Sequence, residues 1–332
     1  MFGRILSIEV FDRYGDSVFL VDPEQETKLQ CSGTIEYLPS SSGSPRATIQ
    51  VYNIPATIAA PIFALKKTMV DENTGEDVLV DDPKFIRISF GYQDENEGKT
   101  SVIFVGTIAR AFTTRQDAMT TITKIYAYQI QNFFTSAVST AQFDAGTSVY
   151  DVVEGLFENS TVQGMDYQIP EALKEHYIDS PISFYGKTLD CVNSILSKVE
   201  YMISTTPMGI VFVPMRPTSA DLDVVILGEY TEDGKVVARS GLIGYPCIDT
   251  EGMRFETLIN PKIVLYSYVW LPNSAIIDNR DGFVPSNQFG ASYDPAGLYR
   301  VVKMTTQFDS HVGACKTSYV AVMAGTSSAY YK

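Results

Sequence analysis

The sequence is poor in the residue types that most often carry catalysis and metal binding. Its 332 residues include two histidines, and its four cysteines are scattered without a C-x-x-C pair. No H-x-x-x-H or H-E-x-x-H spacing is present, so none of the usual zinc patterns applies. Buried free thiols in a chain made in the cytosol explain the cysteines better than a disulfide framework does. The sequence therefore predicts no metal site and no cofactor.

Positive charge is also scarce. The chain has 25 Lys and Arg against 39 Asp and Glu, which gives a formal net charge of −14. No local cluster of basic residues offsets this balance. Such a chain repels phosphate groups, so we expect no specific nucleic-acid binding and no attraction to anionic membranes.

Long hydrophobic runs are missing as well. The longest mostly apolar stretch, Ile54–Leu65, is interrupted by Pro55 and Pro61, and a membrane helix needs about 20 apolar residues. Met1–Gly15 alternates apolar and polar residues and lacks the apolar core of a signal peptide. We therefore expect a soluble chain that does not insert into a membrane.

The two histidines offer little for catalysis. His176 is predicted at the end of a short helix and His311 at a hairpin tip. A Ser-His-Asp or Cys-His arrangement would need one of them, and neither lies in a G-x-S-x-G context. A carboxylate pair for glycoside hydrolysis stays open, because the fold sets its spacing. Together these patterns predict a protein without catalytic residues, which is not an enzyme.

One acidic stretch, Asp71–Asp77, resembles a calcium loop superficially. Its glycine, Gly75, comes one place too early for an EF-hand, and the closing glutamate is missing. We interpret this stretch as a solvated hairpin tip.

The sequence is rich in residues that favour β-structure. It contains 20 Tyr and 18 Phe, and such side chains suit half-buried pleated surfaces. Asn53-Ile54-Pro55 predicts the start of a short helix that runs to Lys67. Alternating runs bounded by turn residues predict strands in the first third, at Ile5–Phe11, Ser17–Val21, Leu29–Tyr37, Arg46–Tyr52, Lys84–Tyr92, Val102–Phe112 and Thr120–Tyr128.

The middle third changes to helical spacing. Thr147 is predicted to cap a first helix, and a hairpin of Tyr201–Thr206 and Gly209–Met215 follows a second one. We interpret this block as a small α/β domain. The apolar faces of the two helices are predicted at Val149, Val152, Val153, Leu156 and Phe157, and at Leu189, Val192, Ile195, Leu196 and Val199.

The last third returns to strands. Gly241–Gly244 leads to Pro246 and not to a helix, so we interpret it as a turn. The fold class predicted for the whole chain is mainly β with a small α/β insert. The strands are expected at Asp223–Leu227, Met253–Ile259, Lys262–Leu271, Tyr299–Thr306 and Ala314–Met323.

Two segments of the sequence echo each other. Asp82–Tyr92 and Asn260–Trp270 share Pro, Lys and Ser at equal spacing, and most other positions are chemically similar. A hairpin with a polar tip is predicted after each segment. Two copies of one β-domain flanking the α/β block explain the repeat most simply. Chance resemblance between two amphipathic strands is the alternative.

Short motifs follow one another in a characteristic order along the chain. The motif positions are Tyr52, Asn53, Gly91, Tyr92 and Gly106 in the first domain, and Gly241, Gly244, Pro246, Asn260, Pro261, Gly297 and Tyr299 in the last. By this order the chain resembles the central baseplate hub proteins of contractile-tailed bacteriophages over nearly its whole length. It departs from the family pattern at Pro55 and Pro61, where the family has a straight polar helix.

The resemblance implies two similar tail-tube-type β-barrel domains, residues 1–140 and 221–332, flanking the α/β domain at 141–220. It implies a structural subunit of the virion, located in the tail baseplate and made in the cytoplasm of the host bacterium. Such hubs are homotrimers, whose six barrels match the sixfold tail tube and whose threefold axis matches the spike. The implied partners are the tail tube protein, the spike protein and other baseplate proteins, with DNA passing through the channel.

Other classes of protein remain as alternatives. The hub of a contractile bacteriocin or of a type VI secretion apparatus would share the fold. A tail-associated cell-wall hydrolase would need a catalytic domain for which the chain has no room. A receptor-binding or carbohydrate-binding tail protein would expose aromatic platforms, whereas the single tryptophan, Trp270, lies within the repeated strand.

Overall fold

The computed structural model divides the chain into two compact units. Unit one comprises Met1–Glu36, Pro45–Gln129 and Thr305–Lys316, and unit two comprises Tyr37–Ser44, Ile130–Met304 and Thr317–Lys332. The domain boundaries expected from the sequence stay a prediction. The structure describes residues 3–12, 16–22, 29–39, 43–63, 66–70, 77–81, 83–93, 99–162, 166–215, 224–227, 230–232, 235–237, 241–249, 251–271, 277–278, 297–311 and 313–325.

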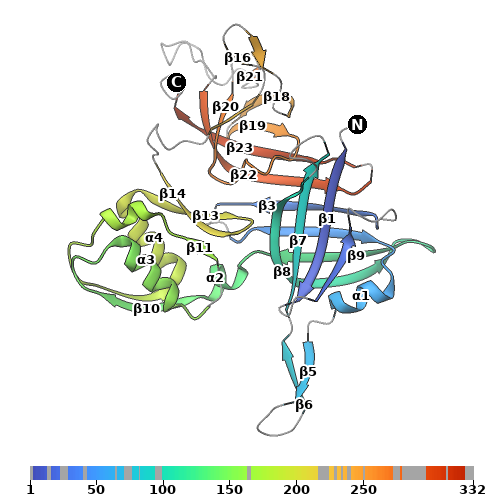
Figure 1. Ribbon diagram of the computed structural model, residues 1–332, viewed down its shortest axis with the longest axis horizontal. Helices are drawn as coiled ribbons and strands as arrows, with labels where there is room; N and C mark the ends of the chain where they lie inside the picture. Colours follow the sequence, from blue (N-terminus) through green and yellow to red (C-terminus); the bar gives the residue numbers. More distant parts are fainter. Residues whose placement is uncertain are drawn as a thin grey trace. The chain divides into compact units, whose positions relative to one another are not determined.

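Unit one is built on an antiparallel sheet with the strand order β2-β1-β7-β8-β9-β4-β3 (Figure 1). The strands predicted for the first third are all present, within a few residues at their ends. Their bounds are Arg4–Asp12 (β1), Ser17–Val21 (β2), Cys31–Tyr37 (β3), Arg46–Tyr52 (β4), Lys84–Tyr92 (β7), Ser101–Arg115 (β8) and Thr121–Tyr128 (β9), with a separate pair at Lys66–Val70 (β5) and Asp77–Asp81 (β6).

The long strand β8 joins two parts of this sheet. It pairs with β7 over Ser101–Thr107 and with β9 over Thr107–Arg115. The register with β9 shifts between Ile108 and Arg110, and such a bulge bends and twists a strand. In Figure 1, β1 and β7 accordingly run across β3, β4 and β9. One sheet thus folds over itself and encloses its own core.

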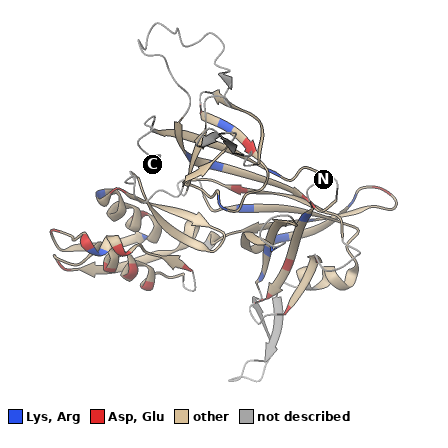
Figure 2. Ribbon diagram, turned by 45° about the horizontal axis from the view of Figure 1, so that its top comes forward, with Lys and Arg blue, Asp and Glu red and all other residues tan. Residues whose placement is uncertain are grey.

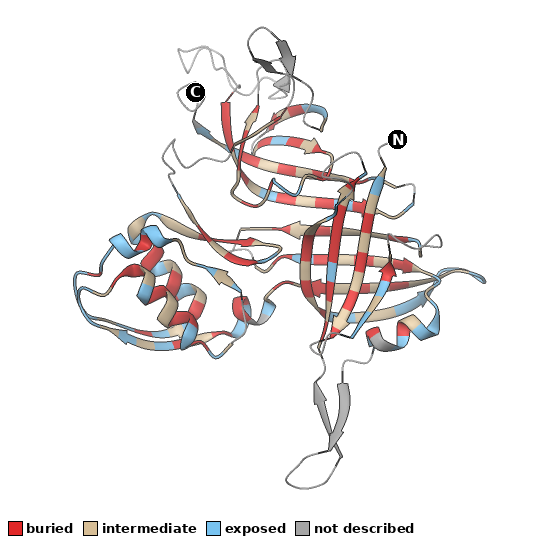
Figure 3. Cartoon of the chain, in the orientation of Figure 1, coloured by how far each residue is buried: buried red, intermediate tan, exposed pale blue. Residues whose placement is uncertain are grey.

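Alternate residues of these strands form the core of unit one. In β1 and β4 every second side chain is buried, as the banding of the strands in Figure 3 shows. Each fully buried Ile or Phe contributes about 1.5–3 kcal/mol relative to an exposed one. The fully buried side chains include Ile8, Ile35, Ile49, Ile86, Ile88, Phe104 and Ile125.

The first helix is shorter than its sequence suggests. Helix α1 spans Ala56–Phe63, and Pro55 accepts its first backbone hydrogen bonds from Ile58 and Ala59. The expectation that it continues to Lys67 is wrong, because Lys66 and Lys67 pair with β6 instead. Asn53, with a φ of +47°, turns the chain between β4 and the helix.

The α/β part of unit two has its own apolar core. Its elements are α2 (Gln131–Ser136), β10 (Val138–Phe143), α3 (Val149–Glu158), β11 (Tyr167–Gln168), η3 (Glu171–Glu175), β12 (Ile182–Lys187), α4 (Thr188–Leu196), η4 (Ser197–Val199), β13 (Tyr201–Thr206) and β14 (Gly209–Pro214). The apolar face predicted for the first helix is confirmed, since its members are the buried residues of α3. Strands β10 and β12, which pair with each other, had no strand prediction.

The cap of α3 lies one residue later than predicted. Ser148, and not Thr147, accepts the backbone N–H of Asp151, and its hydroxyl donates to the carboxylate of the same residue at 2.7 Å. The hydroxyl of Thr147 instead donates to the carbonyl of Asp144. Serine and threonine can both cap a helix. The hydroxyl of Thr147 is bonded in the turn at Asp144, so Ser148 is the residue that caps α3.

The remaining strands of unit two form a second β-region. Their bounds are Val224–Ile226 (β15), Tyr230–Glu232 (β16), Lys235–Val237 (β17), Leu242–Asp249 (β18), Gly252–Thr257 (β19), Tyr268–Leu271 (β20), Ile277–Asp278 (β21), Gly297–Asp309 (β22) and Lys316–Gly325 (β23). Strands β22, β23, β19, β18 and β21 are hydrogen-bonded neighbours in that order, and β20 pairs with both β22 and β15. The end of β22 and the turn after it belong to unit one.

Two sequence expectations fail in this region. The strand expected at Lys262–Leu271 begins only at Tyr268, because the side chain of Asn260 accepts the N–H of Lys262 and starts a turn. Ile263 and Leu265 lie in these turns, and both side chains are buried. Buried side chains at alternate positions are also typical of a strand, which explains the wrong prediction. The turn expected at Gly241–Gly244 is mostly the start of β18, which has a register shift against β19 after Ile243.

The order of strands repeats, although the repeated segment is not strand throughout. The first region has the order β3-β4-β9-β8-β7, and the second has β18-β19-β23-β22-β20. Each set is a hairpin beside a longer hairpin, followed by one further strand. This match supports the interpretation of two copies of one β-domain. The fold class predicted from the sequence, mainly β with a small α/β insert, is confirmed.

Candidate functional site

The most distinctive local structures are two long hairpin arms. The first arm is Ala109–Ile122, which comprises the end of β8, a turn and the start of β9. The second arm is Thr305–Lys316, which comprises the end of β22, a turn and the start of β23. The two arms occupy the same place in the repeated strand order.

The second arm is held by the rest of unit one. Ser310 donates its backbone N–H to the carbonyl of Cys31, and its hydroxyl accepts the N–H of Cys31 at 2.8 Å. The guanidinium of Arg4 donates to the carbonyl of Gly313. These bonds attach the arm beside β3, which would otherwise be the edge of the sheet.

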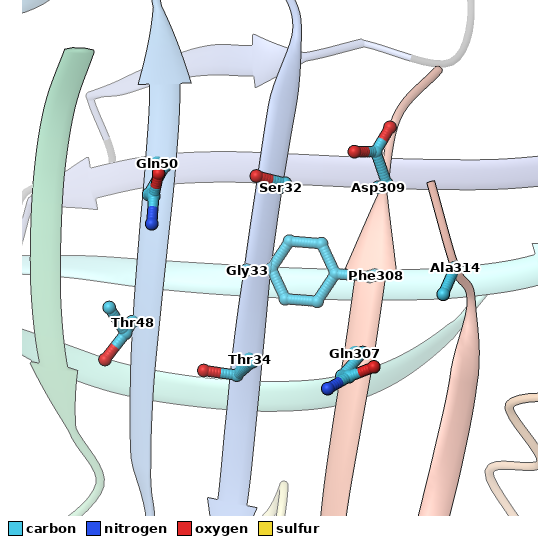
Figure 4. A pocket seen from close by; sticks show the side chains of 9 residues that line it. All are labelled: Ser32, Gly33, Thr34, Thr48, Gln50, Gln307, Phe308, Asp309 and Ala314. Carbon is cyan, nitrogen blue, oxygen red and sulfur yellow. The ribbon is translucent and has the colours of Figure 1, made fainter. Parts of the chain in front are cut away.

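The phenyl ring of Phe308 lies over Gly33 on β3, and a shallow depression of about 250 Å³ surrounds the pair (Figure 4). A Cβ atom at Gly33 would come within 2.5 Å of the Phe308 ring and 2.6 Å of the carbonyl of Thr48. Gly33 is therefore required for this contact, since any side chain would displace the ring. The depression is lined by Ser32, Gly33, Thr34, Thr48, Gln50, Gln307, Phe308, Asp309 and Ala314.

The tip of the second arm contains Asp309, Ser310 and His311, but its geometry is not that of a catalytic triad. Ser310 and the Nδ1 atom of His311 are 2.9 Å apart. The Asp309 carboxylate, however, accepts the backbone N–H of His311 at 2.8 Å. Ser310 also donates to the carbonyl of Leu29. These contacts shape the turn.

The thiols near the second arm are poor nucleophiles. Burial, with a smaller contribution from the carboxylate of Asp309, raises the pKa of Cys31 to about 12. Burial also raises the pKa of Cys315. Because a thiolate is the reactive form, both shifts lower the reactive fraction of these thiols at neutral pH. Cys31, Cys191 and Cys315 are buried free thiols as predicted, whereas Cys247 is half-buried.

The first arm ends in a turn that is ordered by its own residues. The carboxylate of Asp117 accepts the N–H groups of Met119 and Thr120 at 2.8 and 2.7 Å. The guanidinium of Arg115 donates to the carbonyls of Asp117 and Ala118. The hydrogen bond from Met119 contributes most to a lowered pKa of Asp117. The turn presents Met119, which is 89% exposed.

The motif positions of the first domain lie at strand ends and close packing points. Tyr52 ends β4, and Asn53 accepts the N–H of Thr121 at the base of the first arm. Gly91 and Tyr92 end β7, where a side chain at position 91 would come 2.7 Å from the carbonyl of Lys99. A Cβ at Gly106 on β8 would meet the ring of Phe104 at 2.7 Å. These positions shape the sheet and do not converge on a pocket.

The motif positions of the last domain surround β18 and β22. Gly241 and Gly244 have φ values of +74° and +67°, and Pro246 follows on β18. Asn260 and Pro261 form the turn after β19. Gly297 and the buried Tyr299 lie at the start of β22. Gly241 and Gly244 thus lie at the start of β18, whereas Gly297 and the other motif positions are dispersed.

The sequence reasoning missed the contact between Gly33 and Phe308. A glycine inside a predicted strand often marks a close approach by another group, so Gly33 within Leu29–Tyr37 was the available signal. The residue that contacts Gly33 could not be predicted in the same way, because Phe308 is far away in the sequence. Tertiary structure was needed to join the two residues.

No metal site is found in the part of the chain that the structure describes, where no group of three or more His, Cys, Asp or Glu side chains is suitably placed. The acidic stretch that superficially resembles a calcium loop lies outside the described residues, except for Asp77 at the start of β6. His176 lies directly after η3, where a helix end was predicted.

The family model for baseplate hub gp41 matches residues 10–276. The chain belongs to this family. It is a baseplate hub protein, a structural component of a phage-type tail. The resemblance inferred from the order of motifs is thereby confirmed. No curated protein matches the sequence of this hub closely enough to count as a relative.

Solved structures share the fold of the hub at low sequence identity. The tail protein from Neisseria meningitidis MC58 has a TM-score of 0.53 and 8% identity, with 96% of each chain covered. The 43 kDa tail protein of prophage MuSo2 from Shewanella oneidensis has a TM-score of 0.54 and 9% identity, with 96% of the hub and 98% of that chain covered.

A chain of a Francisella protein complex also shares the fold. The match to a chain of the Francisella PdpA–VgrG complex has a TM-score of 0.51 and 7% identity, and it covers 97% of the hub but 58% of that chain. Within the described residues of the hub, no helix has the length and apolar character needed to span a bilayer.

Proposed function

We propose that this hub protein assembles as a homotrimer that joins the sixfold tail tube to the threefold spike and lines the channel for DNA. The observation that carries the proposal is the repeated strand order of β3-β4-β9-β8-β7 and β18-β19-β23-β22-β20. Two similar β-domains per chain become six in a trimer, so one ring presents sixfold contacts on one side and threefold contacts on the other.

The charge balance supports a channel that does not grip DNA. The chain carries a net charge of −14, and acidic walls repel phosphate. Figure 2 shows acidic positions gathered on the helices of the α/β part, where Asp151, Glu154 and Glu158 lie on α3. We assign the hub no catalytic activity. The tip geometry at Ser310 and His311, and the raised pKa values of Cys31 and Cys315, support a structural role.

The hub of a contractile bacteriocin or of a type VI secretion apparatus is the alternative within the same class. The fold shared with a chain of the Francisella PdpA–VgrG complex favours keeping this candidate. A receptor-binding or carbohydrate-binding tail protein is the candidate from another class, and selective binding on a glycan array would support it instead.

Native mass spectrometry of the purified chain across a concentration series tests the proposal. The subunit mass is 36.7 kDa, so a closed trimer is expected at roughly 110 kDa. Electron microscopy of that species should show a ring with pseudo-sixfold symmetry. A species that stays monomeric at every concentration, or a ring of another order, contradicts the trimeric adaptor.

A further inference from the structure

The printed registers allow residue-by-residue comparison of the two β-regions. Cys31, Val51 and Thr123 lie opposite one another across β3, β4 and β9. Leu242, Thr257 and Thr317 lie opposite one another across β18, β19 and β23. The two rows are equivalent in the repeated strand order, and each includes a buried threonine on the hairpin strand, Thr123 or Thr317.

When these two rows are aligned, β18 occupies the place in the second β-region that β3 occupies in the first. Gly244 follows Leu242 by two residues, as Gly33 follows Cys31, but the register of β18 against β19 shifts after Ile243, so Gly244 has no strand partner equivalent to the Ile49 partner of Gly33. The ends of β8 and β22 correspond as well, so Thr114 takes the place of Phe308 one residue before each strand ends. The repeat therefore contains two arms and two sheet edges, at β3 and β18, on which an arm can dock.

The second arm and the β3 edge both belong to unit one. The second arm lies on β3, with Phe308 buried over Gly33 and Cys31 bonded to Ser310. The first arm is exposed at Ala109 and Arg110 and again from Thr113 to its tip. Equivalent strands thus differ in burial, since the second arm lies on an edge of its own unit and most of the first arm is exposed.

Within the described residues, the first half of β18 has no neighbouring strand on the side away from β19. Cys247 and Ile248 pair with β21. Leu242 and Ile243 pair with β19, and Gly244–Pro246 lie in the register shift that follows. Ile243 is exposed, and Tyr245 is 69% exposed. Gly244 has no atom within 4 Å of the place its Cβ would occupy. Ile243 and Tyr245 thus present exposed apolar side chains beside open space, which suits the docking of another surface.

We propose that the first arm of one copy docks on the Leu242–Pro246 edge of a second copy, as the second arm docks on β3 within one chain. The contact is head to tail, because an arm of one copy meets an edge of the next. Met119 at the arm tip and Tyr245 on the edge lose their exposed apolar surface together. The number of copies in the ring rests on the proposed trimeric function.

The internal hydrogen bonds of the arm suit this role. Asp117 and Arg115 order the turn through hydrogen bonds within the arm, before any second copy is bound. Little conformational entropy is therefore lost when the arm docks. The arm and its flank carry Arg110, Arg115 and Lys124 against Asp117, which makes this segment basic in an acidic chain. A basic arm favours approach to another copy of the same acidic protein.

Paired substitutions test the contact. Met119→Lys on the arm and Tyr245→Lys on the edge each place a charge in the proposed interface. Met208→Lys and Tyr185→Lys are matched controls, because Met208 lies in the β13–β14 turn and Tyr185 on β12, with exposures of 68% and 86%. The measured quantity is the concentration at which half of the trimer dissociates, from native mass spectrometry.

The arm and edge variants are expected to raise this concentration about tenfold or more. The control variants are expected to change it by less than about twofold. If the wild-type chain is a trimer and all four variants behave alike, the docking contact is wrong while the trimeric function stands. If the wild-type chain is a monomer at every concentration, the trimeric function and the contact both fail.

Cross-linking identifies which chains meet. Met119→Cys and Tyr245→Cys are placed on chains with different tags, both with Cys247→Ser, and treated with a bismaleimide after mixing and reassembly. A cross-linked product containing both tags supports docking between copies. With both cysteines in one chain, a product that remains a single cross-linked chain shows that the arm closes on its own edge, which overturns the proposal.

Discussion

The two hairpin arms occupy equivalent places in the strand order, yet their surroundings differ. The second arm is buried through Phe308 and bonded through Ser310 to Cys31. The first arm is exposed and relies on a turn built by Asp117 and Arg115. The same backbone element is therefore either part of a core or a self-supporting projection, depending on whether an edge receives it. Burial along a strand is decided by its neighbours more than by its own pattern.

Removing the aromatic ring at the end of the second arm should give the largest effect. Phe308→Ala is expected to lower the free energy of unfolding by about 3–5 kcal/mol, because it leaves a cavity over Gly33. Phe112→Ala on the first arm removes a ring contact with Tyr126 and one with Arg110. Its expected cost is about 1 kcal/mol. Denaturant unfolding of both variants measures the difference, and equal costs would contradict the contrast between the arms.

Gly33 on β3 and Gly244 on β18 should respond for different reasons. Gly33→Ala is expected to cost about 1–3 kcal/mol, because its Cβ would overlap the Phe308 ring and the Thr48 carbonyl. Gly244→Ala has open space, and its φ of +67° alone should cost about 1 kcal/mol. A double-mutant cycle separates the two causes. Gly33→Ala should cost less when Phe308→Ala is also present, whereas Gly244→Ala should cost the same in both backgrounds.

The smallest effect is expected at the tip of the first arm. Asp117→Ala should speed amide hydrogen exchange at Met119 and Thr120 several-fold and leave exchange around Ser310 unchanged, because the broken bonds are local. The hydrogen bonds, that from Met119 first, lower the pKa of Asp117 from its ordinary value. The carboxylate therefore stabilises the turn fully above the ordinary pKa of an aspartate, and this stabilisation is lost as pH falls through the lowered folded-state pKa. An NMR pH titration of the two amides measures this, and unchanged exchange in the variant would show that Arg115 alone orders the turn.

Alternation and helical spacing predicted much of the fold. Arg46–Tyr52 and Lys84–Tyr92 were located from their patterns, as was the apolar face of α3. The pattern was sufficient there because one face of each element is buried against a continuous core. It misled at Lys262–Leu271, where successive turns also bury alternate side chains. It gave no signal for β10 and β12, which are six residues long and bury one side chain each.

The candidate site was less accessible from the sequence. The family motifs identified glycines that shape the sheets, including Gly106 and Gly244. They did not identify the arms as surfaces, because exposure depends on which edge lies beside a hairpin. The pairing of Gly33 with Phe308 joins residues from opposite ends of the chain, and periodicity within one segment carries no information about such a partner.

The sequence by itself determined the class of the molecule: its composition and charge argue for a mainly β structural protein, and the order of its motifs leads to the baseplate hub family. These properties are local or summed over the chain, so they can be read without coordinates. Only the tertiary structure decided that, among the described residues, the second arm is covered while most of the first arm and the start of β18 are exposed. The physical reason is that strand pairing joins segments distant in sequence, and backbone hydrogen bonding alone does not specify which edge a strand will meet.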